Sequence, residues 1–134
     1  MDIRHTIPLA ADYLALRLKT HMGIKDAEKA ETALKNSLFI VSLWEKDTMI
    51  GFGRIVGDGG ITYIISDIMV DPEFQHRGYG KVIMHEIDTY LTQHTDEYAY
   101  VCLIAKKPAD KLYEQFGFRY VSPRACGMKR QQIK

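Results

Sequence analysis

The stretch VDPEFQHRGYGKVIMHEIDTYL (residues 70–91) places Gly78 and Gly80 directly before an apolar pattern with helical spacing. The first amide groups of a helix have no partners inside the helix, and the helix dipole adds a partial positive charge there. Such an end binds anions, most often phosphate. The glycines let an anion approach the backbone, and Arg77 and Lys81 add charge beside them. The stretch therefore predicts an anion site.

Other glycine and metal motifs do not fit this stretch. A dinucleotide-binding G-x-G-x-x-G loop would need glycine at Ile83, and a nucleotide P-loop would need glycine at Gln75 and Ser or Thr at Val82. The zinc-protease pattern H-E-x-x-H begins at His85 but meets Thr89 where its second histidine should stand. We therefore expect no metal. A tight turn from strand to helix would also use the two glycines, and their spacing alone leaves that alternative open.

The surrounding elements indicate one α/β domain over residues 1–134, because no repeat, linker or low-complexity tract interrupts the chain. The first helix should begin near Pro8 and turn Tyr13, Leu14 and Leu18 inward. Asp26 should cap the second helix. The expected order is a strand at 2–7, helices at 9–22 and 26–38, a three-stranded antiparallel meander within 38–70, a helix at 81–94, a strand at 97–105, a helix at 108–118 and a last strand at 118–122.

The loop QHRGYG (residues 75–80) matches the Q/R-x-x-G-x-G/A signature of the GNAT acyltransferase superfamily, which the chain resembles. DIMVDPEF (residues 67–74) resembles the fourth strand of that family and its exit, and KLYEQFGF (residues 111–118) resembles its late helix. The element order agrees from about Ile3 to Met128. The resemblance implies a mixed, mostly antiparallel central sheet, splayed between strands 4 and 5 and flanked by about four helices.

The resemblance also implies acetyl-CoA as the cosubstrate. In the family, the glycine loop holds the pyrophosphate of coenzyme A, and the pantetheine arm lies between the splayed strands against exposed main chain. The cofactor-binding residues implied here are Ile68, Met69, Val70, Gln75, His76, Arg77, Gly78, Tyr79, Gly80 and Lys81.

Two side chains are candidates for proton transfer. An alkyl amine of pKa near 10.4 is neutral in only about one part in 10³ at pH 7, so a base or a water chain should help it react. Asp67 stands one residue before the pantetheine-binding strand segment and is the candidate base, although a hydrogen-bonded strand residue is the alternative. Tyr113 stands where the family places its catalytic tyrosine, which implies a proton donor for the leaving thiolate. An aromatic side chain of the core is its alternative.

Two positions depart from the family pattern. Lys106, seven residues before Tyr113, replaces the asparagine that many members use to bind the pantetheine arm, and YVCLIA (residues 100–105) lacks the acid that some members carry there. The leading hypothesis is an N-acetyltransferase acting on a primary amine of a small molecule or peptide. A non-catalytic acyl-CoA-binding or regulatory module is the alternative.

Composition bounds the partners and the compartment. The net charge of +1 gives no reason to expect nucleic acid, and no run of residues is apolar enough to predict a membrane span. The N-terminus lacks the pattern of a signal peptide, so a cytoplasmic protein is expected. Many relatives are dimers, which makes a homodimer possible. The acceptor should lie near Tyr13, Arg17, Trp44 and residues 57–63, where aromatic side chains on strands are more often core.

Overall fold

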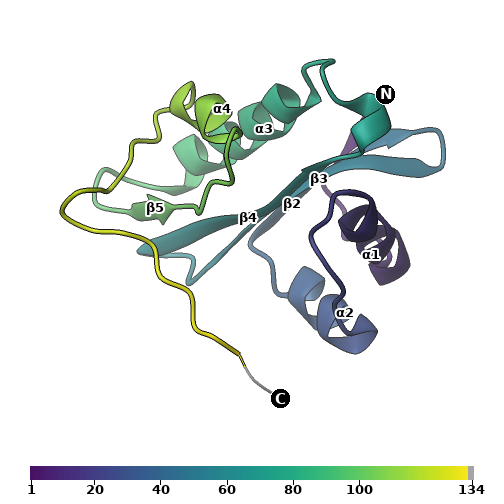
Figure 1. Ribbon diagram of the computed structural model, residues 1–134, viewed down its shortest axis with the longest axis horizontal. Helices are drawn as coiled ribbons and strands as arrows, with labels where there is room; N and C mark the ends of the chain where they lie inside the picture. The colour runs from purple at the N-terminus through teal and green to yellow at the C-terminus, as the bar shows by residue number, and fades with distance from the viewer. Residues whose placement is uncertain (133–134) are drawn as a thin grey trace.

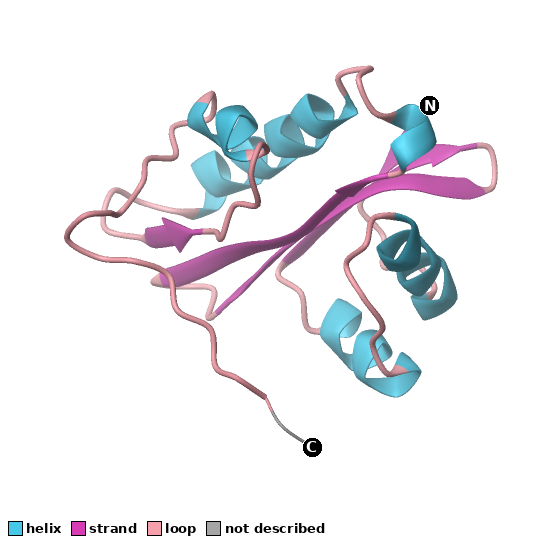
Figure 2. Ribbon diagram, in the orientation of Figure 1, coloured by secondary structure: helices cyan, strands magenta, loops and turns pink. Residues whose placement is uncertain are grey.

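The computed structural model describes residues 1–132, which form a sheet between two helical layers. Helices α1 and α2 cover one face of the sheet, and α3 and α4 cover the other (Figures 1 and 2). The strands are β1 (Asp2–Arg4), β2 (Phe39–Glu45), β3 (Thr48–Gly57), β4 (Thr62–Val70) and β5 (Tyr100–Cys102). The helices are α1 (Ala10–Lys19), α2 (Ala27–Lys35), the 3-10 turn η1 (Pro72–Phe74), α3 (Tyr79–His94) and α4 (Asp110–Glu114).

The five strands stand in chain order, and only the last pair is parallel. Strands β1 to β4 form an antiparallel meander, and α3 makes the crossover from β4 to β5. The β4–β5 pairing ends at Ile64 and Cys102, whereas β4 continues to Val70. The predicted mixed sheet, splayed between strands 4 and 5, is confirmed.

Apolar side chains fill both faces of the sheet. Along β2, Ile40 and Trp44 point towards α1 and α2, and Val41 and Leu43 point towards α3, as the alternation of a strand requires. Trp44 and Tyr63 are 7% and 1% exposed, which confirms the core interpretation of these aromatics. Because both faces are covered, strand ends and loops are the parts of the sheet layer most open to a ligand.

The first two helices confirm part of the sequence pattern. The Asp26 carboxylate accepts a hydrogen bond from the amide of Lys29 at 3.1 Å and caps α2 as predicted. In α1, however, Leu18 is 59% exposed and Arg17 only 5%. The buried face of α1 carries Tyr13, Leu16 and Arg17. The predicted inward position of Leu18 is therefore wrong, because Leu18 faces solvent and the neighbouring Arg17 faces the sheet.

The predicted last strand is also wrong. Residues 118–122 belong to a long loop that follows α4 outside the sheet (Figure 2). Their backbone groups are used locally: the Phe118 amide donates to the Tyr113 carbonyl at 3.3 Å, and the Ala125 amide donates to the Val121 carbonyl at 3.1 Å. Within residues 1–132, no helix is both long and apolar enough to cross a bilayer.

Candidate functional site

The glycine loop turns the chain from η1 into α3 through two left-handed residues. His76 has φ of +64° and Gly78 has φ of +84°, a region that glycine enters without strain. Gly78 is the N-cap of α3, which therefore begins at Tyr79, two residues before the predicted start at Lys81. A Cβ at Gly78 would meet no atom within 4 Å, so open space lies against this part of the backbone.

The first turn of α3 presents unpaired amide groups. The first helical bond runs from the amide of Val82 to the carbonyl of Gly78 at 3.2 Å. Among the described residues, the amides of Tyr79, Gly80 and Lys81 have no acceptor. No side chain caps this helix, and its first turn contains no acid. The amides and the helix dipole together favour an anion here.

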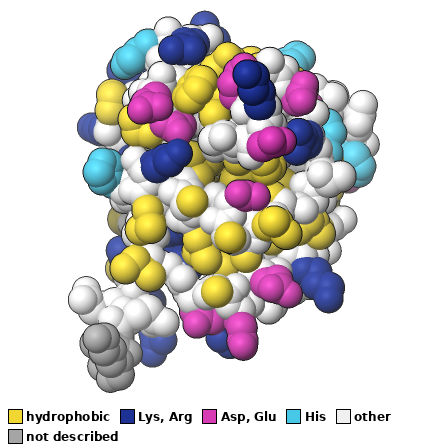
Figure 3. Space-filling model, turned by 90° about the vertical axis from the view of Figure 1, so that its right-hand side faces the viewer, with side chains coloured by type: hydrophobic (Ala, Val, Ile, Leu, Met, Phe, Trp, Pro, Cys, Tyr) yellow, Lys and Arg dark blue, Asp and Glu magenta, His cyan; other side chains and the backbone are white. Residues whose placement is uncertain are grey.

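Side chains around the loop add charge and hold its position. The amide nitrogen Nε2 of Gln75 donates to the carbonyl of Val70 at 3.1 Å, which ties the loop to the end of β4. The guanidinium carbon of Arg77 lies 5.0 Å from the centroid of the Phe74 ring. Lys81 is exposed to solvent. On the face shown in Figure 3, apolar side chains gather around the centre and charged groups stand among them and at the margins.

A bulge bends β4 where it leaves β5. The pairing of β3 with β4 shifts between Phe52 and Arg54, so that Asp67 and Ile68 together lie opposite Gly53. Asp67 has φ of +57°, which is uncommon for a residue with a side chain. A Cβ at Gly53 would lie 2.8 Å from Cδ1 of Ile68 and 2.8 Å from Cγ2 of Ile83, so a larger residue opposite the bulge would displace these side chains.

Beyond the bulge, Ile68, Met69 and Val70 have an open edge. Met69 and Val70 pair with Phe52 and Gly51 of β3 on one side, and Ile68 belongs to the bulge, whereas β5 has already separated from β4 at Ile64. The side chain of Met69 is buried against α1 and α2. Apart from the Val70 carbonyl, which accepts from Gln75, the main chain of this edge is not paired with β5 while the side chains pack, which is an arrangement that an extended ligand can pair with.

The Asp67 carboxylate is enclosed by three donors. Tyr13 donates its hydroxyl to Oδ2 at 2.7 Å and Arg54 donates Nε to the same oxygen at 2.7 Å. Arg17 donates Nη1 to Oδ1 at 3.1 Å. Burial acts to raise the pKa of Asp67, but the bonds from Arg54 and Tyr13 and the two guanidinium charges outweigh it and lower the pKa. A carboxylate in this state is a weak base, which favours a role in holding the bulge.

Arg17 extends the same network to the loop between α1 and α2. Its Nε donates to the carbonyl of Gly23 at 3.2 Å, and its Nη2 donates to the carbonyl of Met22. Sequence reasoning named Arg17 only as an acceptor-site candidate and missed Arg54. The available signal for Arg54 was a charged residue within the otherwise apolar run GFGRIV (residues 51–56) of β3.

Tyr113 lies on α4, which packs against the first turn of α3. A Cβ at Gly80 would stand 3.1 Å from Cδ2 of Leu112, so the two helices meet at the glycine loop. Tyr113 is 8% exposed, and burial raises the pKa of its phenol. Its hydroxyl has no hydrogen-bond partner within the part of the chain that the structure describes. The Tyr113 phenol is therefore protonated at neutral pH.

The side chain of Lys106 extends to the loop between α1 and α2. Its ammonium lies 3.8 Å from the sulfur of Met22, and the residue is exposed. The lysine therefore contacts the loop that Arg17 holds, on the side of the sheet opposite to α3.

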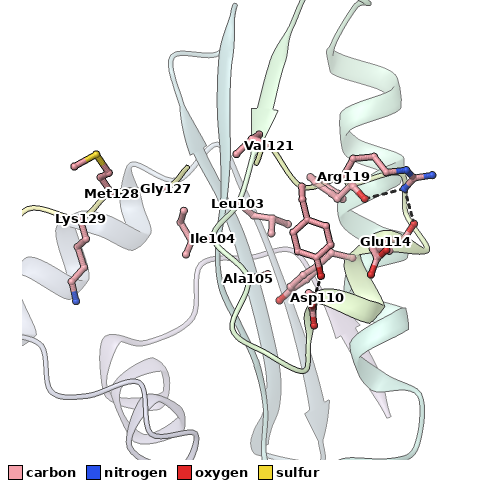
Figure 4. A pocket seen from close by; sticks show the side chains of 13 residues that line it. Leu103, Ile104, Ala105, Asp110, Glu114, Arg119, Val121, Gly127, Met128 and Lys129 are labelled. Atoms are coloured by element: carbon pink, nitrogen blue, oxygen red, sulfur yellow. Dashed lines mark hydrogen bonds between the residues drawn. The ribbon is translucent and has the colours of Figure 1, made fainter. Parts of the chain in front are cut away.

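A pocket of about 550 Å³ opens beside Tyr113. It lies between the chain leaving β5, helix α4 and the C-terminal segment (Figure 4). No residue of the glycine loop lines it, so it is separate from the anion site. Among residues 1–132, no group of three or more His, Cys, Asp or Glu side chains is placed to hold a metal ion.

A family model described as an acetyltransferase (GNAT) domain matches residues 10–128. The chain belongs to the GNAT acetyltransferase family. It is 35% identical over 95 residues to the uncharacterized N-acetyltransferase ycf52 of Pyropia yezoensis, covering 68% of this chain and 53% of that protein. The chain spans about half the length of the curated relatives that it matches first.

Solved structures agree with this membership of the GNAT family. A Staphylococcus aureus protein of unknown function, described as a probable acetyltransferase, shares 44% identity and a TM-score of 0.93, with 98% of each chain covered. A GNAT family protein from Streptococcus pneumoniae shares 28% identity and a TM-score of 0.78, covering 99% of this chain and 98% of that chain.

Proposed function

We propose that residues 1–134 form a single GNAT domain that transfers an acetyl group from acetyl-CoA to a primary amine of a small molecule or peptide. The observation that carries this proposal is the uncapped first turn of α3 beside the open edge of β4. One feature suits a diphosphate and the other suits an extended amide-containing arm. They lie in one continuous segment of chain, from Ile68 to Lys81.

The residues present fit coenzyme A. The free amides of Tyr79, Gly80 and Lys81 suit a doubly charged group, and the open space at Gly78 lets it reach the backbone. We assign the diphosphate to the loop residues Gln75, His76, Arg77, Gly78, Tyr79, Gly80 and Lys81. The main chain of Ile68, Met69 and Val70 would pair with the pantetheine arm and donate one amide to the acyl oxygen. Acetyl-CoA, when bound, supplies an acetyl group activated as a thioester.

We assign Tyr113 to proton donation. Its hydroxyl is protonated at neutral pH because burial raises its pKa, and it is not engaged by any described residue. It would give its proton to the departing sulfur. A free thiol has a pKa of about 8.5, so the thiolate is already a moderately good leaving group. Proton donation by Tyr113 would make its departure easier.

The predicted role of Asp67 as a general base stays a prediction, and its surroundings favour a different role. Both carboxylate oxygens accept hydrogen bonds from Arg17, Arg54 and Tyr13, and the pKa is lowered. We assign Asp67 to holding the bulge that opens β4. The amine would then lose its proton to solvent through a water chain.

Calorimetry with coenzyme A and a thiol-release assay with a panel of amines test the proposal. We expect one coenzyme A bound per chain and thiol release that depends on an amine. Pantetheine, which lacks the diphosphate, should bind far more weakly. Binding without turnover for any amine would favour the non-catalytic module, and a folded protein that gives no binding heat would refute both functions.

A further inference from the structure

The side chain of Asp110 lines the pocket beside Tyr113 and is largely shielded from solvent, although α4 lies near the molecular surface. The residue is only 7% exposed, and much of the remaining lining is apolar, including Leu103, Ile104, Val121 and Met128. Among the described residues, the side chain that donates a hydrogen bond to its carboxylate is the hydroxyl of Tyr120. The pocket therefore combines an apolar wall with a carboxylate.

Among the described residues, no cation forms an ion pair with this carboxylate, although the charges of Lys111 and Lys107 act on it from a greater distance. Two cationic side chains line the pocket, but the Arg119 guanidinium donates to the carbonyls of Glu114 and Phe118 at 3.2 and 2.9 Å. Lys129 lies at the opposite side of the pocket from Asp110 (Figure 4). The ion pairs of residues 1–132 include Lys111 with Glu114 but none with Asp110.

Asp110 is charged at neutral pH. The hydrogen bond from Tyr120 lowers the pKa of Asp110, with smaller contributions from the charges of Lys111 and Lys107, and the same bond raises the pKa of Tyr120 to about 12. A covered carboxylate whose partner is a neutral phenol is best satisfied by a cation of matching size. Within an apolar pocket, that cation is best supplied by a ligand with a hydrocarbon body.

We propose that this pocket, in place of the region predicted around Tyr13, Arg17, Trp44 and residues 57–63, binds the acceptor. The acceptor then carries two nitrogens: one that remains protonated on Asp110 and one that reacts beside Tyr113. The inference rests on the proposed function and narrows its substrate to a diamine or a larger amine with a second cationic centre. Two nitrogens are needed because a carboxylate stabilises the protonated form of the amine that it holds. That nitrogen keeps its proton, and a protonated amine does not attack a thioester.

The spacing on α4 puts Asp110 and Tyr113 next to each other on the helix. Asp110 and Tyr113 are three residues apart on one helix face, where neighbouring Cβ atoms are roughly 5–6 Å apart. A short alkyl chain spans this distance. An acceptor with a carboxylate in place of the second amine would be repelled by Asp110 and should be a poor substrate.

The test compares 1,4-diaminobutane, 1-aminobutane and 4-aminobutanoate in the thiol-release assay at saturating acetyl-CoA. We expect kcat/KM for the diamine to exceed that for 1-aminobutane by about tenfold or more, and 4-aminobutanoate to be the slowest. In Asp110→Asn the ratio of the diamine to 1-aminobutane should fall to about one. Glu97→Gln, which removes an exposed carboxylate outside the pocket, should preserve the wild-type ratio.

Equal kcat/KM values for the diamine and 1-aminobutane in the wild-type protein would overturn the inference, whatever the variants do. An unchanged ratio in folded Asp110→Asn would do the same. If no amine turns over, direct calorimetry with 1,4-diaminobutane decides: binding that Asp110→Asn abolishes supports the site, and absence of binding refutes it. Coenzyme A binding is measured separately, so failure of the proposed function is recognised independently.

Discussion

The negative charge of Asp67 balances the guanidinium groups of Arg17 and Arg54 on the face of the sheet that α1 covers. Asp67→Asn preserves the shape of the side chain but leaves the buried Arg17 and the partly buried Arg54 without a counter-charge. We expect it to lower the free energy of unfolding by about 3–5 kcal/mol, measured by urea denaturation. Asp47→Asn, on an exposed turn, is the control and should change stability little. Equal stability of the two variants would contradict a structural role for the network.

Tyr113→Phe tests the proton donor. The substitution removes only the hydroxyl and keeps the ring, whose centroid lies 6.5 Å from the centroid of the Phe118 ring. We expect kcat to fall about 10- to 100-fold, while the affinity for coenzyme A is unchanged. Steady-state kinetics and calorimetry measure the two quantities. Tyr98→Phe, at an 82% exposed position, should leave kcat at its wild-type value.

At the residue scale, motif positions were predictable and partners distant in sequence were not. The glycine loop leads into α3 as its motif indicated, because glycine and charge next to a helical pattern are local signals. The partners of Asp67 lie 13, 50 and 54 residues away in the sequence, and no periodicity links them. A single sequence therefore suggested a base where the fold has an ion-pair network.

The glycine loop can be tested as an element by comparing two glycines with similar conformations. Gly78 and Gly23 have φ of +84° and +89°, and a Cβ at either would meet no atom within 4 Å. Alanine at either position should cost about 1–2 kcal/mol of stability. Only Gly78→Ala should also weaken coenzyme A binding, by about tenfold, because its methyl group would occupy the anion's space. Equal coenzyme A affinities in both variants would argue against the loop.

Element prediction succeeded where the signal was local. Asp26, which stands before an amphipathic stretch, correctly predicted the start of α2. The signal is local, because the capping hydrogen bond joins two residues that are only three apart in the sequence. The last strand failed because residues 118–122 have strand-like composition, yet their backbone groups bond to nearby turns. The bulge at Asp67 could not be predicted, because it depends on how β3 and β4 pair.

Acid should destabilise the whole molecule through Asp67. Its pKa in the folded protein is below the usual 3.8, so the stabilisation from its charge is fully present above about pH 4 and is lost as pH falls through the folded pKa. Unfolding free energies of the wild type and Asp67→Asn should converge as pH drops below 4. Urea titrations between pH 7 and pH 2 measure this, and a constant difference would exclude the mechanism.

Ligand binding should raise the stability of the whole domain. At a free concentration 100 times its Kd, coenzyme A should add about 2.7 kcal/mol to the unfolding free energy. Pantetheine at the same concentration should add far less, since it lacks the group that the start of α3 is proposed to hold. Thermal melts with each compound provide the measurement. Equal stabilisation by both would show that the diphosphate contributes nothing.

The arrangement of the complete sheet came from the family resemblance. Periodicity indicated strands and a crossover, but hydrophobic patterns do not say where two parallel strands separate. The three residue pairs between β4 and β5 depend on the bulge and on the length of β5, both set by tertiary packing.

The early separation of β5 also suggests a route to inhibition. The edge from Ile68 to Val70 is proposed to bind the cosubstrate through hydrogen bonds to the main chain, so its proposed specificity is for backbone-like groups. A short extended peptidomimetic that pairs with this edge would compete with the cosubstrate without carrying a nucleotide. Resistance by mutation would be difficult, because side-chain changes leave main-chain donors and acceptors in place.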